Sequence, residues 1–414
     1  MKTTHALPFR FVVPLLLLPL AACTGDASEL VSSSSEAVSE SPDGLNIGFN
    51  DFMPGNDEFA YADRFFTESD AYLASIGRSP PGTRHCHAYP SWDVGTQAPG
   101  SGSVSDGASR RWFETWLGYA EGHCDEALIS FKWSEGAKPA MGTAEQNAQG
   151  VAEVEKAFVA FRSQVWPGWT GKFSFTPWNE PNNAAGTGNG LGVQIPADVA
   201  AAYYLVMRKH CDGSDCKVAA GDFASNGTMG TDFLMKCSDD NGQSLCSAAS
   251  YMDKYKNYIA RNAKAAGLGS GFRPEYFAYH GWDDINDYLR VGSHCDDVQH
   301  CTTRALLQSL SEATWTGAKI WDTEVGVGQR LTDGPDPDDV EQACGASFLL
   351  RLSANLSNRI ERIYYTRIFD SGGYWTLFDA NDTTGPSGKT RPAFTVLADR
   401  NLAYKPPAGR GTCP

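Results

Sequence analysis

Two glutamates in this sequence each stand at the end of a run of residues that is typical of a β-strand. Glu180 lies in FTPWNEPNN, where Pro181 directly behind it stops the strand from pairing further. Glu324 lies in KIWDTEVGVG, 144 residues later (324 − 180). Because charged side chains are almost never buried without a partner, a carboxyl group at a strand tip contributes nothing to a hydrophobic core. Both side chains are therefore candidates for chemistry.

Two carboxyl groups that face each other can cleave a glycosidic bond. One must be protonated to help the leaving oxygen depart, and the other must be ionised to attack the anomeric carbon or to activate water. Different surroundings must hold the two pKa values apart. This chemistry requires a fold that brings the tips of the two strands together.

Strand-like and helix-like segments alternate along the chain. The expected strands are 45–51, 83–93, 127–133, 172–181, 216–223, 274–282, 318–326 and 362–370. The expected helices include 143–165, 196–211, 302–314 and 338–355, the first with Thr143 as N-cap and Gln146 three residues on. Strands separated by helices indicate a parallel sheet, and eight such units predict a single (β/α)8 TIM barrel with loop insertions.

An open, doubly wound sheet is the alternative fold. It would need a ligand fingerprint, and the sequence has neither G-x-G-x-x-G after the first strand nor a Walker A loop. We interpret the glycine-rich GTGNGLG at 186–192 as a loop on the rim of the site. In a TIM barrel the active site lies at the carboxyl ends of the strands. Glu180 and Glu324 would end the fourth and seventh strands and face each other across the mouth.

The motifs WNEPN (178–182) and TEVG (323–326) resemble those of the clan A glycoside hydrolases, retaining enzymes with a (β/α)8 barrel. The resemblance covers most of the domain in strand order and spacing, although only these motifs are specific and they match no single family. It implies that Glu180 is the general acid/base and Glu324 the nucleophile. It also implies that Asn179 binds the sugar hydroxyl beside the anomeric centre and that His280 orients the nucleophile side.

Further substrate-binding residues are expected around this pair. By resemblance, Arg84 corresponds to an arginine near the nucleophile, and Trp375 to a platform on which a sugar ring stacks. Trp133 and Asp222 end the third and fifth expected strands, so both are predicted at the mouth. Asp322, two residues before the second glutamate, is expected on the same face one layer deeper. The structural alternatives are a satisfied core histidine, an arginine paired elsewhere, and tryptophans that only pack.

The chain begins with features of an exported lipoprotein. FVVPLLLLPL is too short to span a bilayer as a stable helix but is typical of a signal-peptide core. Leu-Ala-Ala-Cys at 20–23 resembles a bacterial lipobox with Cys23 as the lipidated residue, and an ordinary secretory signal is the alternative. By resemblance to Gram-negative lipoproteins, Thr24 rather than Asp after this cysteine favours the outer membrane or cell surface. We expect a signal peptide at 1–23, a Ser-rich disordered tether at 24–43 and the catalytic domain at 44–414.

The charge and the cysteine count restrict the partners. A net charge of −15 and a pI of about 5.0 argue against nucleic acid binding, which needs clustered Lys and Arg. The expected partners are a polysaccharide or oligosaccharide and, through the lipid anchor alone, a membrane. Without Cys23, ten of the eleven cysteines remain, an even number that favours disulfides in an exported protein. Proximity suggests the pairs Cys211–Cys216, Cys237–Cys246 and Cys295–Cys301, after which Cys86–Cys124 and Cys344–Cys413 remain.

Three functions are therefore open. The first is a retaining β-glycosidase or β-glycanase that needs no cofactor. The second is a barrel that binds glycans without cleaving them. The third is a metal-dependent hydrolase with ligands among His85, His87, His294 and His300, although none of their motifs has the form of a structural zinc site.

Overall fold

The protein is represented by a computed structural model that describes most of the chain after residue 44. The described residues are 45–50, 56–77, 83–133, 138–183, 194–211, 215–225, 250–296, 301–327, 339–356, 359–366, 377, 390–400, 403–410 and 412–414. The expected signal peptide with Cys23, the tether, the 186–192 loop, Trp375, His300 and the Cys237–Cys246 pair lie outside them.

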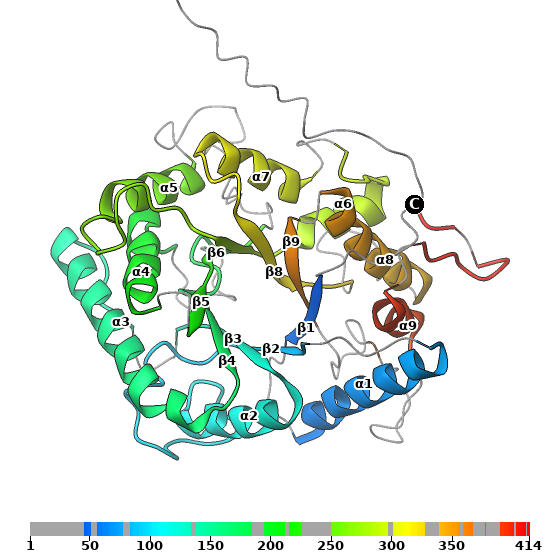
Figure 1. The fold of residues 1–414 in the computed structure, drawn as a ribbon, viewed down its shortest axis with the longest axis horizontal. Coiled ribbons are helices and arrows are strands. Elements are labelled where there is room, and N and C mark those ends of the chain that lie inside the picture. The colour runs from blue at the N-terminus through cyan, green and yellow to red at the C-terminus, as the bar shows by residue number, and fades with distance from the viewer. Residues whose placement is uncertain are drawn as a thin grey trace, which may run out of the picture. The chain divides into compact units, whose positions relative to one another are not determined.

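A parallel sheet forms the centre of the domain (Figure 1). Its strands are β1 (Asn46–Asn50), β2 (His85–Ala88), β3 (Glu126–Ser130), β4 (Lys172–Thr176), β5 (Cys216–Val218), β6 (Ala220–Phe223), β7 (Tyr276–Tyr279), β8 (Lys319–Val325) and β9 (Ile360–Tyr365). They are ordered β5-β4-β3-β2-β1-β9-β8-β7-β6. Only Ala219 separates β5 from β6, so these are two halves of one barrel strand and the sheet closes on itself. The predicted (β/α)8 TIM barrel is confirmed.

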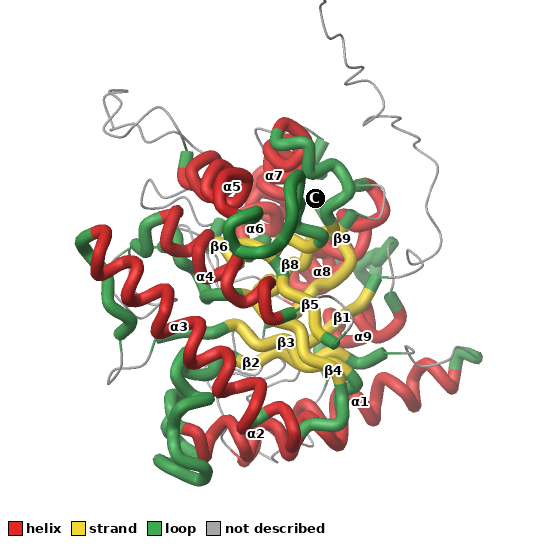
Figure 2. The backbone as a smooth tube through the Cα atoms, turned by 60° about the vertical axis from the view of Figure 1, so that its left-hand side comes forward, coloured by secondary structure: helices red, strands yellow, loops and turns green. Residues whose placement is uncertain are grey.

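Helices surround this barrel on the outside (Figures 1 and 2). They are α1 (Asn56–Ser75), α2 (Arg110–His123), α3 (Ala144–Gln164), α4 (Ala197–His210), α5 (Tyr251–Asn262), α6 (Trp282–Val291), α7 (Thr302–Glu312), α8 (Asp339–Asn355) and α9 (Pro392–Asp399), with a short 3-10 helix, η2 (Trp166–Gly168). The four expected helices correspond to α3, α4, α7 and α8. The capping box at the start of α3 forms between Thr143 and Gln146, as predicted.

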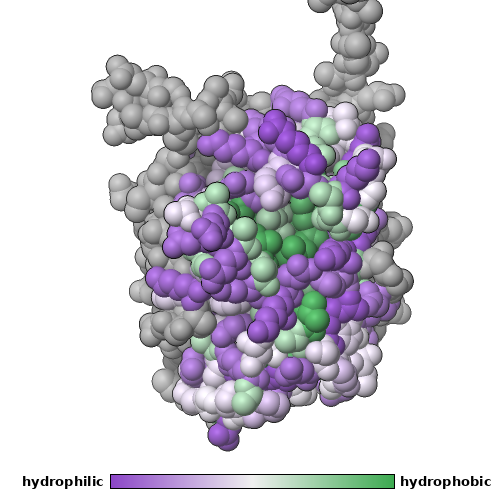
Figure 3. All heavy atoms as spheres, turned by 90° about the vertical axis from the view of Figure 1, so that its left-hand side faces the viewer, coloured by the Kyte–Doolittle hydropathy of each residue, from purple (hydrophilic) through white to green (hydrophobic). Residues whose placement is uncertain are grey.

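The main hydrophobic core lies between the barrel and the helices. Phe161 of α3 illustrates it, because its ring centroid lies 5.6 Å from that of Phe131 and 5.7 Å from that of Phe175. Figure 3 shows the side on which α3 and α4 lie in Figure 1, where hydrophilic residues surround a small hydrophobic area. In the described part of the chain, no helix is both long and apolar enough to cross a membrane.

An apolar layer fills the middle of the barrel. It is made of Leu128, Ala219, Ala278, Trp321 and Tyr364, all of them fully buried. A β-carbon added to Gly48 of β1 would lie 2.6 Å from a ring carbon of Tyr364. The glycine therefore leaves the space that this tyrosine ring occupies. Polar side chains lie above and below the apolar layer, at the carboxyl and amino ends of the strands respectively.

Two irregularities in the sheet re-aim side chains at the carboxyl ends of the strands. On β6 the register shifts between Gly221 and Phe223, which makes Asp222 an extra residue relative to β7. On β8 the register shifts between Asp322 and Val325, so three steps along β8 correspond to two along β9. A bulge of this kind changes the face of the sheet to which the following side chain points. These two bulges lie where the sequence predicts site residues.

Four of the five suggested disulfides lie within the described residues, and all four are present. They are Cys86–Cys124, Cys211–Cys216, Cys295–Cys301 and Cys344–Cys413. The first ties β2 to the end of α2, and the last ties α8 to the C-terminal segment. Two of these four pairs are close in sequence, and the other two are those that remained after the close pairs were assigned.

Candidate active site

The segment after β4 holds Glu180 at the mouth of the barrel. Trp178 is fully buried and packs against Tyr203 of α4, with ring centroids 5.5 Å apart. Asn182 exchanges two hydrogen bonds with Ala224, donating from Nδ2 to its carbonyl at 2.8 Å and accepting from its N–H through Oδ1 at 2.9 Å. Between these anchors Glu180 has a φ of 48°, which is uncommon outside glycine. The WNEPN sequence thus makes a sharp, well-supported turn.

His280 lies between the two glutamates. Its Nδ1 is 3.0 Å from Glu180 Oε1 and 3.5 Å from Glu324 Oε2. One carboxylate oxygen of each glutamate and one ring nitrogen of His280 lie within 4.8 Å of one another. The side chains of Glu180 and Glu324 are 10% and 15% exposed, so both are shielded yet accessible. The two carboxyl groups meet across the mouth, as their places after the fourth and seventh barrel strands require.

Asp222 supports His280 from below. Its Oδ1 lies 3.5 Å from His280 Nε2, and its carboxylate accepts hydrogen bonds from the Thr176 hydroxyl at 2.6 Å and from the Thr323 hydroxyl. The bulge on β6 and a φ of 80° direct this side chain into the barrel. Asp222 is fully buried. It therefore orients His280, and the expectation that it contacts substrate needs correction.

The carboxylates keep His280 charged. Burial alone would lower the pKa of this imidazole, but the charge of Glu324 and the nearby carboxylates of Asp222 and Glu180 raise it well above its ordinary value. Burial would likewise raise the pKa of Asp222, yet His280, aided by the hydrogen bond from Thr176, holds it below its usual value. His280 is thus an imidazolium at neutral pH, with Asp222 as its permanent counter-ion.

His87 is a neutral imidazole that lies beneath the charged His280. Its Nε2 lies 2.7 Å from Ser130 Oγ, and its Nδ1 lies 3.1 Å from the Thr323 carbonyl. Burial, opposed mainly by the charge of Asp222, lowers the pKa of His87 to about 3. An uncharged imidazole here adds polar contacts without a second positive charge.

Sequence reasoning missed two residues that touch the glutamates. The Tyr89 hydroxyl donates to Glu324 Oε2 at 3.4 Å, and Asn183 Nδ2 donates to Glu180 Oε2 at 3.0 Å. Burial, with the charge of Glu324 next in size, raises the pKa of Tyr89 well above its ordinary value, so its proton stays on. Tyr89 lies two residues beyond His87, so the period-2 rule for a strand could have placed it at the mouth.

Asn179 and Trp133 are both predicted to contact substrate beside the glutamates, and their surroundings differ. Asn179 is 3% exposed, and its backbone N–H donates to the Phe131 carbonyl at 2.7 Å, which fixes it directly before Glu180. Trp133 is partly buried, and Lys138 Nζ lies 4.9 Å from its ring centroid, so one face of this ring is covered. The position of Asn179 therefore suits the predicted sugar contact better than that of Trp133 does.

Asp322 acts on the backbone behind the site. Its Oδ1 accepts from the Gly281 N–H at 2.8 Å and thereby fixes the chain next to His280. Burial raises the pKa of Asp322 well above its ordinary value. The expectation that this side chain shares a face with Glu324 was wrong, because the bulge on β8 lies between the two residues.

Arg84 was expected near the nucleophile, and the structure places it elsewhere. Arg84 precedes β2 and lies at the amino end of the strands, away from the glutamates. Its guanidinium pairs with Asp70 of α1 and lies 5.1 Å from the Phe66 ring centroid. Because β2 begins only at His85, the arginine stands at the start of the strand and not at its tip. It connects the barrel to α1.

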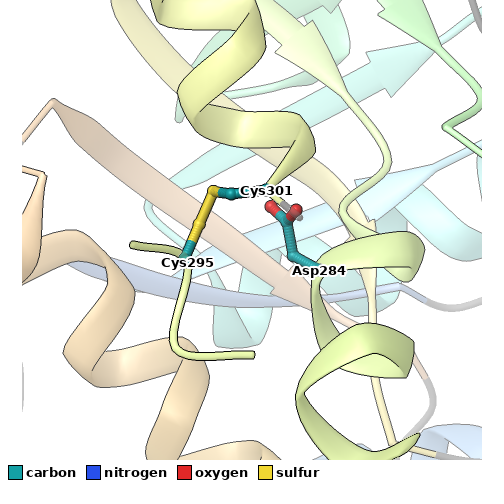
Figure 4. A group of neighbouring side chains, drawn as sticks. All are labelled: Asp284, Cys295 and Cys301. Carbon is teal, nitrogen blue, oxygen red and sulfur yellow. A yellow bond between two sulfur atoms is a disulfide. The ribbon is translucent and has the colours of Figure 1, made fainter. Parts of the chain in front are cut away.

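The histidines of the metal hypothesis do not form a cluster in the described residues. His85 and His87 are buried on β2, and His294 is exposed beyond α6. Two groups have metal-like spacing: one is Glu180 with His280 and Glu324, and the other is Asp284 with Cys295 and Cys301. Figure 4 shows that the two cysteines of the second group are joined as a disulfide, so their thiolates are not available as ligands.

No protein-family model matches this chain, and no curated protein matches it in sequence. Similar solved structures include a glucosidase from Croceicoccus marinus, with 11% identity and a TM-score of 0.43 over 76% of this chain and 60% of that one. The chain thus spans less than two thirds of that glucosidase.

Two other similar structures are matched over nearly their whole length. A GH128 (subgroup I) endo-beta-1,3-glucanase from Amycolatopsis mediterranei has 15% identity and a TM-score of 0.38 over 86% of this chain and 98% of that one. Xylanase B from Clostridium stercorarium F9 has 14% identity and a TM-score of 0.44 over 86% and 97%. Similarities of this size say nothing about function, and the fold assignment rests on the strand order described above.

Proposed function

We propose that this protein is a glycoside hydrolase that cleaves a β-glycosidic bond in an extracellular glycan with retention of configuration. The observation that carries the proposal is the approach of the Glu180 and Glu324 carboxyl groups, which have oxygens within 4.8 Å of each other. Retaining enzymes hold their carboxyl groups about 5–5.5 Å apart, whereas inverting enzymes leave about 6.5–9.5 Å for a water molecule. One oxygen of each carboxyl group within 4.8 Å of the other is in keeping with the shorter range, which supports direct attack by a carboxylate.

In the first step Glu324 attacks the anomeric carbon while Glu180 protonates the leaving oxygen. The bond between the anomeric carbon and that oxygen breaks as the ester bond to Glu324 forms. Tyr89 and His280 both lie close to Glu324 Oε2, at 3.4 and 3.5 Å, and hold this carboxylate in one orientation. Asn183 supports Glu180 in the same way.

In the second step Glu180 takes a proton from water, which attacks the anomeric carbon and releases Glu324. The His280 imidazolium suits both steps, because its Nδ1 proton lies within reach of either glutamate. When Glu324 is ionised, the proton stabilises that carboxylate. When Glu324 is esterified and Glu180 has lost its proton, the same N–H donates to Glu180 instead.

Substitution of each glutamate tests the roles. Wild-type protein is first screened against β-glycans and aryl β-glycosides, and the configuration of the released sugar is followed by NMR. We expect a retained configuration and a loss of about 10³-fold or more in kcat for Glu324→Gln on every substrate. For Glu180→Gln we expect a smaller effect on dinitrophenyl glycosides, because that leaving group needs no protonation in the first step. Full turnover by Glu324→Gln would sink the proposal.

A metal-dependent hydrolase is the second candidate, because Glu180, His280 and Glu324 also have metal-like spacing. The two candidates differ in a simple experiment. A chelator abolishes turnover by a metal-dependent enzyme, and a divalent cation restores it, whereas a two-carboxylate glycosidase is unaffected. Glycan affinity without bond cleavage over the whole panel would instead favour a binding protein.

We further propose that the protein is exported and lipidated at Cys23, in the outer membrane or on the cell surface. The support is the apolar 11–20 segment and the Leu-Ala-Ala-Cys at 20–23. Labelling cells with radioactive palmitate tests this. We expect label on the wild-type protein and none on Cys23→Ala, and an unlabelled wild-type protein in the medium would indicate ordinary secretion.

A further inference from the structure

Lys132 occupies the mouth of the barrel without a role in the chemistry described so far. Along β3, Leu128 contributes to the apolar layer inside the barrel, and Ser130 contacts His87 in the polar layer above it. Alternate residues of a strand point to the same face, so Lys132 is next on the inward face, one layer nearer the mouth. The charge of Glu324 acts on its ammonium group, which agrees with this position.

The backbone around Lys132 is firmly held. Its N–H donates to the Pro90 carbonyl at 3.0 Å, and its carbonyl accepts from the Trp92 N–H at 2.8 Å. These bonds surround a parallel bridge between Ser91 and Lys132. The lysine therefore starts from a fixed point between the segment that carries Tyr89 and the segment that carries Glu180.

The ammonium group of Lys132 has no hydrogen-bond or ion-pair partner among the described residues, although the residue is only partly exposed. Lys256 shows the contrast, because its buried ammonium contacts the Ser309 carbonyl at 2.9 Å, the Ser309 hydroxyl at 2.7 Å and Asp253 at 3.2 Å. Burial lowers the pKa of Lys132, and the charge of Glu324 opposes this. A shielded cation without close partners is unusual unless a ligand completes it.

The proposed reaction would leave the Lys132 ammonium group with even less negative charge nearby. When Glu324 forms the glycosyl ester, it loses the negative charge that faces Lys132. An anionic group on the bound sugar would keep the lysine paired throughout the cycle. A highly charged polyanion is a poor fit, because the protein has a net charge of −15 and would repel it over long distances. A mainly neutral glycan with scattered acidic residues satisfies both conditions.

We propose that Lys132 forms a subsite beside Glu324 for a carboxylate or sulfate group, so that the substrate is a β-glycan with scattered acidic sugars. This inference rests on the proposed function for the identity of the ligand as a sugar. The carboxylate and the sulfate share the same chemistry of recognition, a charge-assisted hydrogen bond from the ammonium group. The experiment below separates the two sources.

The test is direct binding of three small probes, followed by NMR titration: methyl β-glucuronide, methyl β-glucoside 6-sulfate and methyl β-glucoside. The proteins are wild type, Lys132→Met, Lys132→Arg and Lys264→Met. Lys264 is an exposed lysine just after α5, at the amino end of the barrel strands, and its substitution removes the same charge far from the mouth. We expect wild type to bind one anionic probe about tenfold more tightly than the neutral one.

Lys132→Met should lose that preference, while Lys132→Arg and Lys264→Met keep most of it. The anionic probe that binds identifies the source as a uronic acid or a sulfate ester. Equal binding of all three probes, a preference that survives in Lys132→Met, or no binding of any probe overturns the inference. Preferential binding without cleavage of any glycan would sink the proposed hydrolase but keep the subsite, and cleavage of neutral glycans with no preference would do the reverse.

Discussion

The barrel contains two polar layers built from the same kinds of side chain, and they behave in opposite ways. At the amino end, Arg362 Nη1 donates to Glu126 Oε1 at 2.7 Å, and His85 Nδ1 lies 4.0 Å from Glu126 Oε2. Burial and the charge of Arg362 lower the pKa of His85 to about 3. At the carboxyl end, the carboxylates raise the pKa of His280 well above its ordinary value. One histidine is neutral and the other is charged.

The difference follows from the number of permanent cations in each layer. In the lower layer, Arg362 pairs with the Glu126 carboxylate, so a proton on His85 would gain no further stabilisation. The upper layer has three carboxylates, those of Glu180, Asp222 and Glu324, around His280, while its other histidine, His87, stays neutral. An excess of carboxylates over fixed positive charge leaves protons to be shared, and shared protons are what acid/base catalysis uses. The lower layer is suited to stability and the upper one to reaction.

The largest expected effect comes from breaking the lower layer. Arg362→Met leaves Glu126 buried without its cation, and we expect a loss of about 3–5 kcal/mol in the free energy of unfolding, measured with denaturant. Glu126→Gln combined with Arg362→Met should recover much of this loss, because no uncompensated charge then remains. If the double variant is no more stable than Arg362→Met, the two residues do not act as a pair.

A smaller effect is expected from removing the shared cation of the upper layer. His280→Asn takes away the donor to both glutamates, and we expect kcat/KM to fall about 10²–10³-fold. The pH dependence of stability provides a second readout. Since the folded-state pKa is raised, the stabilisation is complete below about pH 6.5 and is lost as the pH rises through the folded-state value. The alkaline decline in stability should therefore be weaker in His280→Asn than in wild type.

The smallest effect at neutral pH is expected for His85→Asn, which should change the free energy of unfolding by about 1 kcal/mol or less. In acid the substitution is expected to favour the variant over wild type. With a folded-state pKa of about 3, wild-type His85 takes up a proton only on unfolding, so its contribution to stability is lost as the pH falls from about 6.5 towards 3. The variant should lose less stability in acid than wild type does. Equal acid sensitivity would show that His85 is not neutral in the folded protein.

The barrel was predictable from sequence because each strand is an apolar run between helical segments. The two glutamates could be found for the same reason, since a charged residue ending such a run stands out. Asp322 and Glu324 show the limit of this reasoning. An ideal strand places both on one face, but Trp321 lies in the apolar layer inside the barrel and Thr323 bonds to Asp222, which leaves Asp322 on the outward face. The register shift then brings Glu324 to His280.

Contacts between distant segments were harder to predict. Tyr89 lay inside an expected strand, yet only the folded barrel reveals that its hydroxyl meets Glu324. The expectation for Arg84 came from the family resemblance alone. Arg84 stands at the start of the expected strand 83–93, as it does at the start of β2, whereas the glutamates lie at the carboxyl ends of the strands.

The bulges on β6 and β8 have a consequence for how this site can be inherited. Because each adds one residue to its strand, the number of residues matters as much as their identity. A descendant that lost a single position between Trp321 and Glu324 would keep the glutamate of the TEVG motif but turn that acid away from His280. Comparison of relatives by motif alone would overlook this change, whereas counting the residues of the strand would reveal it.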